Sequence, residues 1–533
     1  MRIFFMVRRK FTTKHRYYNK FLYQKSNIIF FKINVLYKKI ASNTISQILS
    51  KMITALISIF LIGILTKYLP MELYGSYNKI YSYLGIFAFL ADLWLYTITI
   101  REISQAEHKK EKIIGNVLSL RTLLWIAIWI LAFIIALFLP GYNNILSLCA
   151  ICIVGAFTLV SLINSSLLAL MQSQMKMEFS LLSLVAWKLI NLSLIALFLI
   201  FIFTDTSLTN VAFLSVFIAG FLGICLNTYM NYRYAQKIVD ISYRWDWEYI
   251  KYIFKISLPY GIALFLSVVY FKVDVILLSL LESPEKADIS IALYGLPMKI
   301  IEVLMVLWGF YLNSLLPSLT QKYTQKKFTE ISHILWLSLK ILASFWFCIF
   351  LVGHLFARET IAIIATDEYI SPIGHIFNSV QALQVVLAVL LFYFLSLTFI
   401  YILIASQRQS LLLWINIIVT IFNIIGNIMV IPYYSFLGSA YITLCSQILL
   451  FILSSFIVLR SISLPIQYIA SIGVTTLYGG LLYALFYNFD FWRQWGDISI
   501  MLSIVPVFLI FYSIGEYIFS WKLIRKSLSI VSR

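Results

Sequence analysis

Basic side chains inside long apolar stretches are the residues of this chain best placed to do chemistry. A cation in a membrane core is costly unless it meets a partner or a water-filled cavity, so a set of them predicts a cavity with surplus positive charge. Lysine acts as a point charge toward phosphate, which favours an anionic, phosphate-bearing occupant. The candidates for contacts to such a substrate are Lys51, Lys79, Arg121, Lys188, Lys272 and Lys299.

Snorkelling is the alternative for cations near the end of an apolar stretch. There a long side chain reaches the headgroup region and does nothing further. This alternative stays open for Lys51, Lys79 and Lys299. Lys272 lies well inside its stretch and Lys188 is ten residues into another, so snorkelling explains these two less well.

Acidic side chains accompany several of the cations. Lys299 and Glu302 are three residues apart, which places them on one helix face, and Lys272 and Asp274 are two apart. Asp92 precedes a basic and an acidic residue at positions 101 and 102. We expect Asp92, Asp274 and Glu302 either to hold the cations in place or to bind a coupling ion.

The composition identifies a membrane protein. The 533 residues are 62% hydrophobic and 12% charged, with a mean hydropathy of +0.92, which lies outside the range of soluble domains. A membrane-crossing helix needs about 20 mostly apolar residues. Fourteen such spans are predicted, at 44–67, 77–100, 114–139, 145–172, 179–204, 207–235, 256–281, 291–320, 334–357, 375–405, 411–432, 437–459, 466–488 and 498–518.

The distribution of basic residues predicts the orientation. Counting Lys and Arg outside the spans places 29 on the side of the N-terminus and three on the other, with nine inside spans, so both termini are expected to be cytoplasmic. This asymmetry accounts for the net charge of +19 without nucleic-acid binding. The basic tail, residues 1–42, either lies along the anionic inner leaflet or is solvated, and both alternatives stay open.

The cysteines suggest neither a disulfide nor a metal site. All five lie in apolar runs, where a thiol behaves as a small hydrophobe. Cys149 and Cys152 form a C-x-x-C, but no second Cys or His pair accompanies it. We predict no metal site and no cofactor.

A short repeat predicts two related halves. The string LYGSYNKI at 73–80 returns as LYGLPMKI at 293–300, and Lys51 and Lys272, Lys79 and Lys299 follow nearly the same offset. A shift of six spans preserves orientation, so we predict two pseudo-symmetric six-helix lobes plus two C-terminal helices. The lobes are 43–235 and 256–460, joined by a cytoplasmic linker at 236–255, with the extra helices in 461–533. The Tyr-Gly part of the repeat is expected to form an outer turn with tyrosine at the interface.

Several longer stretches carry a family resemblance. They include LTKYLPMELYGSYN, FLADLWLYTITIREIS, FKISLPYGIALFLSVVYFKVDVILL and INIIVTIFNIIGNIMVIPYYSFLGSAYIT, in that order along residues 40 to 460. Their order and spacing resemble the multidrug/oligosaccharidyl-lipid/polysaccharide exporter superfamily, within it the polysaccharide biosynthesis proteins known as Wzx-type flippases. Trp94 stands where the family usually has a small residue, and the basic tail is extra.

The resemblance implies a function and a location. It implies translocation of an undecaprenyl-pyrophosphate-linked oligosaccharide from the inner to the outer leaflet of a bacterial plasma membrane, for O-antigen, capsule or exopolysaccharide. A polysaccharide polymerase and a chain-length regulator are the partners it suggests, besides membrane lipids. Nucleic acid is not an expected partner.

Two other functions stay open. The first is a cation-coupled multidrug exporter of the same superfamily, against which the surplus of lysine argues. The second is an integral-membrane polymerase or glycosyltransferase, for which the outer connections ESPEKADIS and RETIAIIATDEYISPIGH are short. No P-loop string occurs, so ATP hydrolysis through that motif is excluded, and the chain is not expected to be an enzyme.

Overall fold

The fold is that of a computed structural model. It describes residues 49–462 except 51, 93–94, 175 and 203–207, together with 465, 473, 477–481 and 483–484. The basic tail 1–42 and the predicted span 498–518 lie outside these residues, as does most of the predicted span 466–488.

Long helices make up the described part of the chain, which contains no strand. Eight helices in the described ranges are long and apolar enough to cross a membrane, and the first twelve predicted spans each fall on a helix. The predicted all-α polytopic membrane fold is confirmed. The helices are Met52–Tyr68, α2 Met71–Asp92, α3 Leu95–Gln105, α4 Lys110–Phe138, α5 Ile145–Ser173, α6 Met177–Ala196, α7 Thr209–Ala235, α8 Trp247–Leu281, α9 Pro284–Thr324, α10 Phe328–Leu355, α11 Ala357–Ile364, α12 Ser379–Ala405 and α13 Gln409–Leu459.

The longest helix, α13, is two spans folded back on each other. Ser435 has φ 51° and ψ −144°, which no helical residue adopts. On either side of it the arms approach: Asn423 donates to Ser446 over 3.2 Å, and a Cβ on Gly426 would lie 2.9 Å from a methyl carbon of Ile442. The predicted separate spans 411–432 and 437–459 are therefore the two arms of a hairpin that turns at Ser435.

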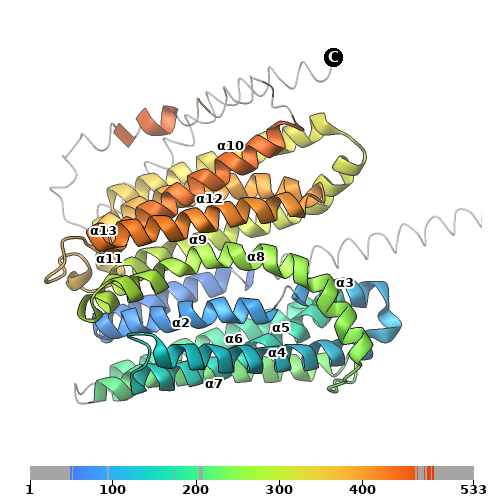
Figure 1. The fold of residues 1–533 in the computed structure, drawn as a ribbon, viewed down its shortest axis with the longest axis horizontal. Helices are drawn as coiled ribbons and strands as arrows, with labels where there is room; N and C mark the ends of the chain where they lie inside the picture. Colours follow the sequence, from blue (N-terminus) through green and yellow to red (C-terminus); the bar gives the residue numbers. More distant parts are fainter. Residues whose placement is uncertain are drawn as a thin grey trace, which may run out of the picture.

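Two groups of helices lie side by side (Figure 1). The N-terminal group is Met52–Tyr68 with α2 to α7, and the C-terminal group is α8 to α13. Within them α5 packs on α4 and α7, and α12 packs on α9, α10 and α13, while α2 packs on both α8 and α9 and so joins the groups. The exact borders of the predicted lobes stay a prediction.

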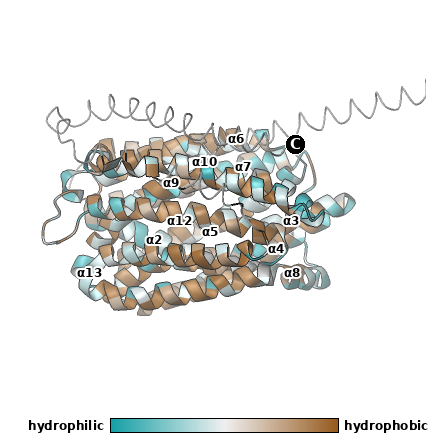
Figure 2. Cartoon of the chain, turned by 90° about the horizontal axis from the view of Figure 1, so that it is seen from above, coloured by the Kyte–Doolittle hydropathy of each residue, from teal (hydrophilic) through white to brown (hydrophobic). Residues whose placement is uncertain are grey.

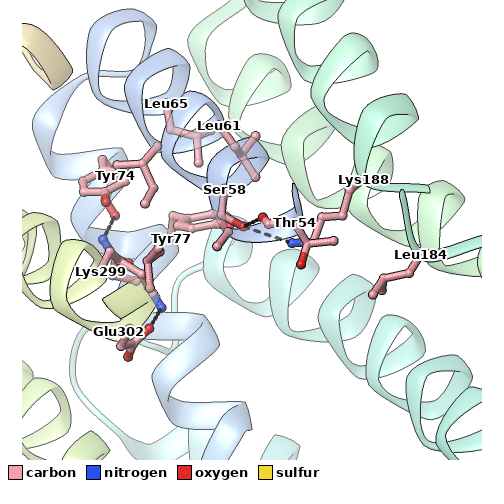
Figure 3. A pocket seen from close by; sticks show the side chains of 14 residues that line it. Thr54, Ser58, Leu61, Leu65, Tyr74, Tyr77, Leu184, Lys188, Lys299 and Glu302 are labelled. Carbon is pink, nitrogen blue, oxygen red and sulfur yellow. Dashed lines mark hydrogen bonds and ion pairs between the residues drawn. The ribbon is translucent and has the colours of Figure 1, made fainter. Parts of the chain in front are cut away.

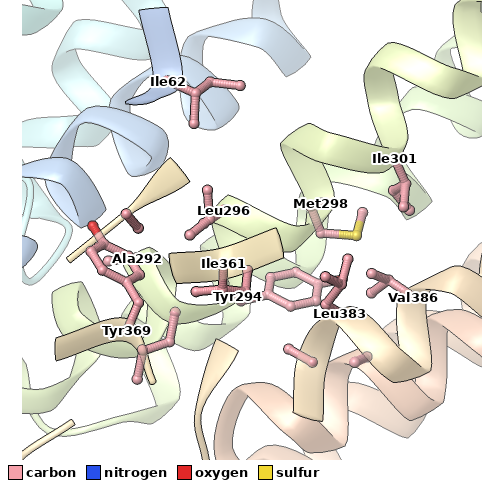
Figure 4. Close-up of a cluster of buried hydrophobic side chains, with 14 of the residues drawn as sticks. Ile62, Ala292, Tyr294, Leu296, Met298, Ile301, Ile361, Tyr369, Leu383 and Val386 are labelled. Atoms are coloured by element: carbon pink, nitrogen blue, oxygen red, sulfur yellow. The ribbon is translucent and has the colours of Figure 1, made fainter. Parts of the chain in front are cut away.

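Apolar side chains pack over part of the interface between the two groups as well as in the interior of each. One buried cluster takes Leu61, Ile195 and Ala219 from the N-terminal group and Ile291 and Phe394 from the C-terminal group. Figure 4 shows part of it, where Ile62 faces Ala292 and Leu296 of α9, with Ile361 and Tyr369 beside them. Figure 2 shows apolar residues along most of each helix and hydrophilic ones gathered near the ends, which is the distribution that a lipid environment requires.

Loops define two ends of the bundle. One end carries residues 139–145, 282–283, 365–378 and the turn at 435, and the sequence predicts that this end is outer. The opposite end carries α3, residues 236–246 and residues 325–327, and the sequence predicts that it is inner. In Figure 1 α11 lies at the left, predicted outer, end and α3 at the right, predicted inner, end.

The repeated Tyr-Gly string lies in helices, not in outer turns. Gly75 lies within α2 and Gly295 within α9. A Cβ on Gly75 would overlap the carbonyl oxygen of Asp288 in α9, and a Cβ on Gly295 would lie 2.8 Å from Nδ2 of Asn78 in α2. The two glycines thus let α2 and α9 cross at close range. The expected turn was wrong because glycine serves close helix approach as well as turns.

The tyrosines of the repeat are buried, and their expected position at the membrane interface was wrong. Tyr74 and Tyr294 are each only 1% exposed, so neither lies at an interface with headgroups. The repeat marks one contact between the two groups of helices, to which each copy contributes its glycine.

The Gly75 contact gives a first prediction. Replacing Gly75 by alanine puts a methyl carbon against the Asp288 carbonyl, so we expect α2 and α9 to separate at the predicted outer end. Double electron–electron resonance between labels at Asn143→Cys and Ile373→Cys, in a chain whose five native cysteines are serine, should then show a longer distance. Both label positions are exposed.

The matched control for this prediction is Gly85→Ala. Among the described residues, and apart from the backbone of α2 itself, a Cβ on Gly85 in α2 meets no atom within 4 Å, so the distance distribution of Gly85→Ala should equal that of the parent. Equal distributions in Gly75→Ala and the parent would contradict the proposed tight crossing.

Candidate functional site

A cavity of about 380 Å³ lies between the two groups of helices (Figure 3). The helix Met52–Tyr68, α2 and α6 of the N-terminal group form one side, and α9 of the C-terminal group forms the other. Its volume is in the range of small-molecule sites. The polar lining residues are Thr54, Ser58, Tyr74, Tyr77, Asn78, Lys188, Lys299 and Glu302.

Two lysines share one glutamate at the α9 side of the cavity. Lys299 Nζ lies 2.7 Å from Glu302 Oε2, and Lys272 Nζ, from α8, lies 3.3 Å from Glu302 Oε1. The three side chains are 26% to 38% exposed, so the group is accessible. Because one carboxylate faces two ammonium groups, the cluster keeps surplus positive charge.

Lys188 adds a third cation from the N-terminal group. It projects from α6, and its Nζ lies 3.5 Å from Ser58 Oγ. Figure 3 shows Lys188 across the cavity from Lys299 and Glu302. The structure therefore brings together Lys188, Lys272, Lys299 and Glu302 from the predicted site residues.

Tyrosines form one wall, which the sequence analysis did not foresee. Tyr74 and Tyr77 stack at 6.2 Å between ring centroids with an interplanar angle of 13°. The hydroxyl of Tyr74 is buried and has no hydrogen-bond partner among the described residues. A signal for this wall exists in LYGSYNKI, where the two tyrosines are three apart and so share a helix face.

Lys79 does not line the cavity. Its Nζ lies 2.6 Å from Asp288 Oδ1, and Lys79 is only 2% exposed. Ser76 donates to the other carboxylate oxygen of Asp288 over 2.8 Å. Lys79 thus joins α2 to α9 next to the Gly75 crossing.

Arg121 and Asp92 form a second ion pair away from the cavity. Arg121 is fully buried, and its Nη2 lies 2.5 Å from Asp92 Oδ1. Its Nη1 donates to Ser166 over 2.7 Å and to the Leu162 carbonyl over 3.1 Å. This ties α4 to α2 and α5. Lys51, the remaining predicted cation, lies outside the described residues.

Asp274 lies in a separate polar cluster inside the C-terminal group. It is fully buried and accepts hydrogen bonds from Thr443 over 2.6 Å, Tyr294 over 2.9 Å and Asn427 over 3.2 Å. These partners come from both arms of α13 and from α9. Hydrogen bonds between helices are therefore present at Asn427, in the asparagine-rich first arm of α13.

Oxygen atoms are in excess around Asp274. Asn427 donates through Nδ2 and leaves Oδ1 buried with no hydrogen-bond partner among the described residues. Thr443 and Tyr294 add two hydroxyl oxygens beside the carboxylate. A carboxylate with neutral oxygens suits a hard cation or a proton. In the described part of the chain no three His, Cys, Asp or Glu side chains form a metal-binding group.

Two family models match the chain. The model described as polysaccharide biosynthesis protein matches residues 40–321, which is more than half of the chain. The MatE model matches residues 259–429. Curated protein sequences gave no significant match.

Three solved structures share the fold at low identity. The lipid II flippase MurJ, in an inward closed conformation, has a TM-score of 0.69 at 17% identity, covering 91% of this chain and all of that one. An inward-facing MATE family multidrug resistance transporter of the MOP superfamily has a TM-score of 0.62 at 13% identity, covering 78% of this chain and 98% of that one. The MATE multidrug transporter DinF-BH has a TM-score of 0.58 at 15% identity, covering 79% of this chain and 95% of that one. At these identities the likeness establishes the fold alone.

Proposed function

The chain belongs to the polysaccharide biosynthesis protein family, and from that premise we propose that it is a flippase for a lipid-linked oligosaccharide. Its substrate is an undecaprenyl-pyrophosphate-linked repeat unit, which it moves from the inner to the outer leaflet. The similarity to the structure of MurJ, a lipid II flippase, supports a lipid-linked substrate.

The observation that carries the proposal is the charge of the central cavity. Lys188 and Lys299 line it from opposite sides together with one acidic residue, Glu302, and Lys272 from α8 pairs with the same Glu302. A pyrophosphate diester carries negative charge on both phosphate groups, and lysine serves such groups as a point charge. Tyr77, which is half-buried, offers the exposed part of its ring to the sugar next to the pyrophosphate. The polyprenyl chain stays in lipid.

Movement by alternating access gives Lys79 its role. The Lys79–Asp288 ion pair and the Gly75 crossing close the predicted outer end between α2 and α9. Release of the headgroup to the outer leaflet requires this contact to open while the predicted inner end closes. Lys79 then acts as part of a gate instead of as a substrate contact.

Asp274 is the residue we assign to ion coupling. Its cluster is internal to the C-terminal group, so occupation by a monovalent cation or a proton changes the packing of both arms of α13 against α8. Glu302 serves as the partner of the lysines. Arg121 and Asp92 stabilise the packing of the N-terminal group.

Charge and family support the cellular setting. The excess of Lys and Arg on one side supports cytoplasmic termini, and membership of the polysaccharide biosynthesis protein family supports a bacterial inner membrane. The product would serve O-antigen, and hence lipopolysaccharide, or capsule or exopolysaccharide, with a polymerase and a chain-length regulator as partners.

A multidrug exporter is the second candidate, favoured by the MatE match over residues 259–429. Such a protein expels amphipathic cations, and the three lysines oppose a cation in the central cavity. The two candidates therefore differ in the sign of charge that the cavity accepts.

Reconstitution tests the proposal. Proteoliposomes with the full chain should move a fluorescent undecaprenyl-pyrophosphoryl disaccharide between leaflets, measured by loss of protection from dithionite, while protein-free vesicles should not. Ethidium serves as the cationic probe in the same vesicles. Transport of ethidium without movement of the lipid-linked sugar would overturn the flippase and establish the exporter.

A further inference from the structure

A second cavity, of about 310 Å³, lies at the predicted outer end of the C-terminal group. It is formed by the end of α8, the start of α9, the loop 374–377 and the turn of α13 at 431–436. None of its lining residues belongs to the central cavity. The role of this second cavity is not explained by the gate or the lysine cluster.

The carboxylate of Glu282 is only partly satisfied in this cavity. One oxygen, Oε1, accepts a short hydrogen bond from Ser435, and Ser435 lies 3.2 Å from Ser290 between hydroxyl oxygens. The other, Oε2, is buried and has no hydrogen-bond partner among the described residues. A buried carboxylate oxygen without a donor is costly, so a ligand that donates a hydrogen bond there is stabilised.

Backbone strain is stored at the same place. Ser435 has a φ of 51° and a ψ of −144°, a backbone conformation that residues with a side chain rarely adopt. Its hydroxyl donates a hydrogen bond to Glu282. Such strain persists where surrounding contacts impose it, and it gathers at functional sites. The turn thus presents a fixed polar wall to the cavity.

Charges of both signs lie around the cavity. Lys286 is exposed and lines it together with Glu282 and His375. Burial, and after it the charge of Lys286, lower the pKa of His375, which lies in a loop, so the imidazole is neutral near pH 7. An anion here would meet Glu282 and a cation would meet Lys286. A neutral ligand with several hydroxyls can donate to Glu282 and accept from Lys286 and His375.

We propose that this outer cavity binds a sugar residue. Its volume suits one ring, and Phe377 and Tyr433 supply apolar and aromatic surface beside the polar groups. The proposal rests on the proposed function for its orientation, which makes the cavity a site for the glycan on the outer side of the membrane. Glu282 accepts from sugar hydroxyls and Lys286 donates to them.

Saturation-transfer NMR on the full chain in lipid nanodiscs tests this site. The probes are glucose, galactose and N-acetylglucosamine, each alone. We expect at least one to bind, with a Kd that rises about tenfold in Glu282→Gln, because a neutral amide is a weaker acceptor than a carboxylate. Glu72→Gln, an exposed glutamate at the same predicted end, should leave the Kd unchanged.

Lys286→Met provides a second variant should Glu282→Gln fail to fold, since Lys286 is exposed, and it should weaken binding severalfold. No binding of any of the three sugars would overturn the proposal. The proposal would also be overturned if Lys188→Gln, in the central cavity, changed the Kd for the sugar and Glu282→Gln did not. Calcium binding that depends on Glu282, without sugar binding, would assign the cavity to a cation.

Failure of this inference and failure of the proposed function give different results. Sugar binding through Glu282 in a chain that moves no lipid keeps the outer site and removes the flippase. Movement of the lipid-linked disaccharide with no sugar binding at Glu282 keeps the flippase and removes the outer site.

Discussion

Replacing Lys299 by glutamine is expected to reduce movement of the lipid-linked disaccharide by about tenfold to a hundredfold, the loss typical of one charge-assisted contact. The physical reason is a change of balance in the cavity. Lys299 and Lys272 share Glu302, and without Lys299 the remaining pair is neutral. Lys299→Arg keeps the charge and should retain part of the rate.

Initial rates in proteoliposomes at equal protein content measure this effect. Lys67→Gln is the matched control, because Lys67 is an exposed lysine of the helix Met52–Tyr68 and does not line the cavity. Wild-type rates in Lys299→Gln would remove the cationic cavity from the mechanism.

A double variant separates substrate contact from neutralisation of Glu302. If Lys299 serves only to balance Glu302, then Lys299→Gln with Glu302→Gln should recover the rate. If Lys299 binds the pyrophosphate, the double variant should stay slow. Recovery would show that Lys299 acts through its charge balance with Glu302, because the double variant restores the surplus charge of Lys272, and the substrate contact would then come from Lys188 or Lys272.

The fold was largely predictable because lipid imposes it. Backbone groups in hydrocarbon must be paired within the segment, so a long apolar run can only be a helix. The hairpin at Ser435 was predicted as two spans for the same reason, from the polar break PYYS at 432–435. Lipid exposure, however, gives no information about which helix faces which.

Spacing along a helix explains which site residues were predictable. Lys299 and Glu302 are three apart on one face, and they form the expected ion pair. Lys272 and Asp274 are two apart and point to different sides of α8, so Lys272 meets Glu302 and Asp274 meets α13. Their closeness in sequence suggested a pairing that helix geometry disfavours.

The cations of the N-terminal group illustrate a different limit. Lys79 and Arg121 lie in apolar runs much as Lys188 does, but Lys79 meets Asp288, 209 positions later, and Arg121 meets Asp92 in a neighbouring helix. A single sequence does not show such long-range partners. The same limit hid Asp288, whose side chain receives both Lys79 and Ser76.

Replacing Asp274 by asparagine is expected to uncouple transport from the ion gradient. The substitution keeps size and one acceptor oxygen, so the hydrogen bonds from Thr443 and Tyr294 to one carboxylate oxygen can persist, while the one that Asn427 donates to the other oxygen is lost. It removes the carboxylate from a cluster whose other named members are neutral, and a cation bound among neutral oxygens alone is held far more weakly. Transport driven by a sodium or proton gradient should therefore fall to the rate without a gradient.

Two measurements on Asp274→Asn bear on different steps. In proteoliposomes the wild-type rate should depend on the gradient, whereas the rate of Asp274→Asn should be the same with and without the gradient. The control is Asp240→Asn, which replaces an exposed aspartate at the predicted inner end and should behave as wild type. In thermal unfolding, a bound ion raises the Tm of the native state by mass action. If sodium is the coupling ion, sodium chloride should raise the wild-type Tm above its value in choline chloride and leave Asp274→Asn unchanged.

The thermal result also decides between a cation and a proton. A sodium-dependent Tm that requires Asp274 assigns the cluster to sodium. A Tm independent of sodium, with a rate that follows a proton gradient and requires Asp274, assigns it to a proton carried on the carboxylate. Gradient dependence that survives in Asp274→Asn would place coupling elsewhere, and Asp274 would then serve only to hold the two arms of α13 against α8 and α9.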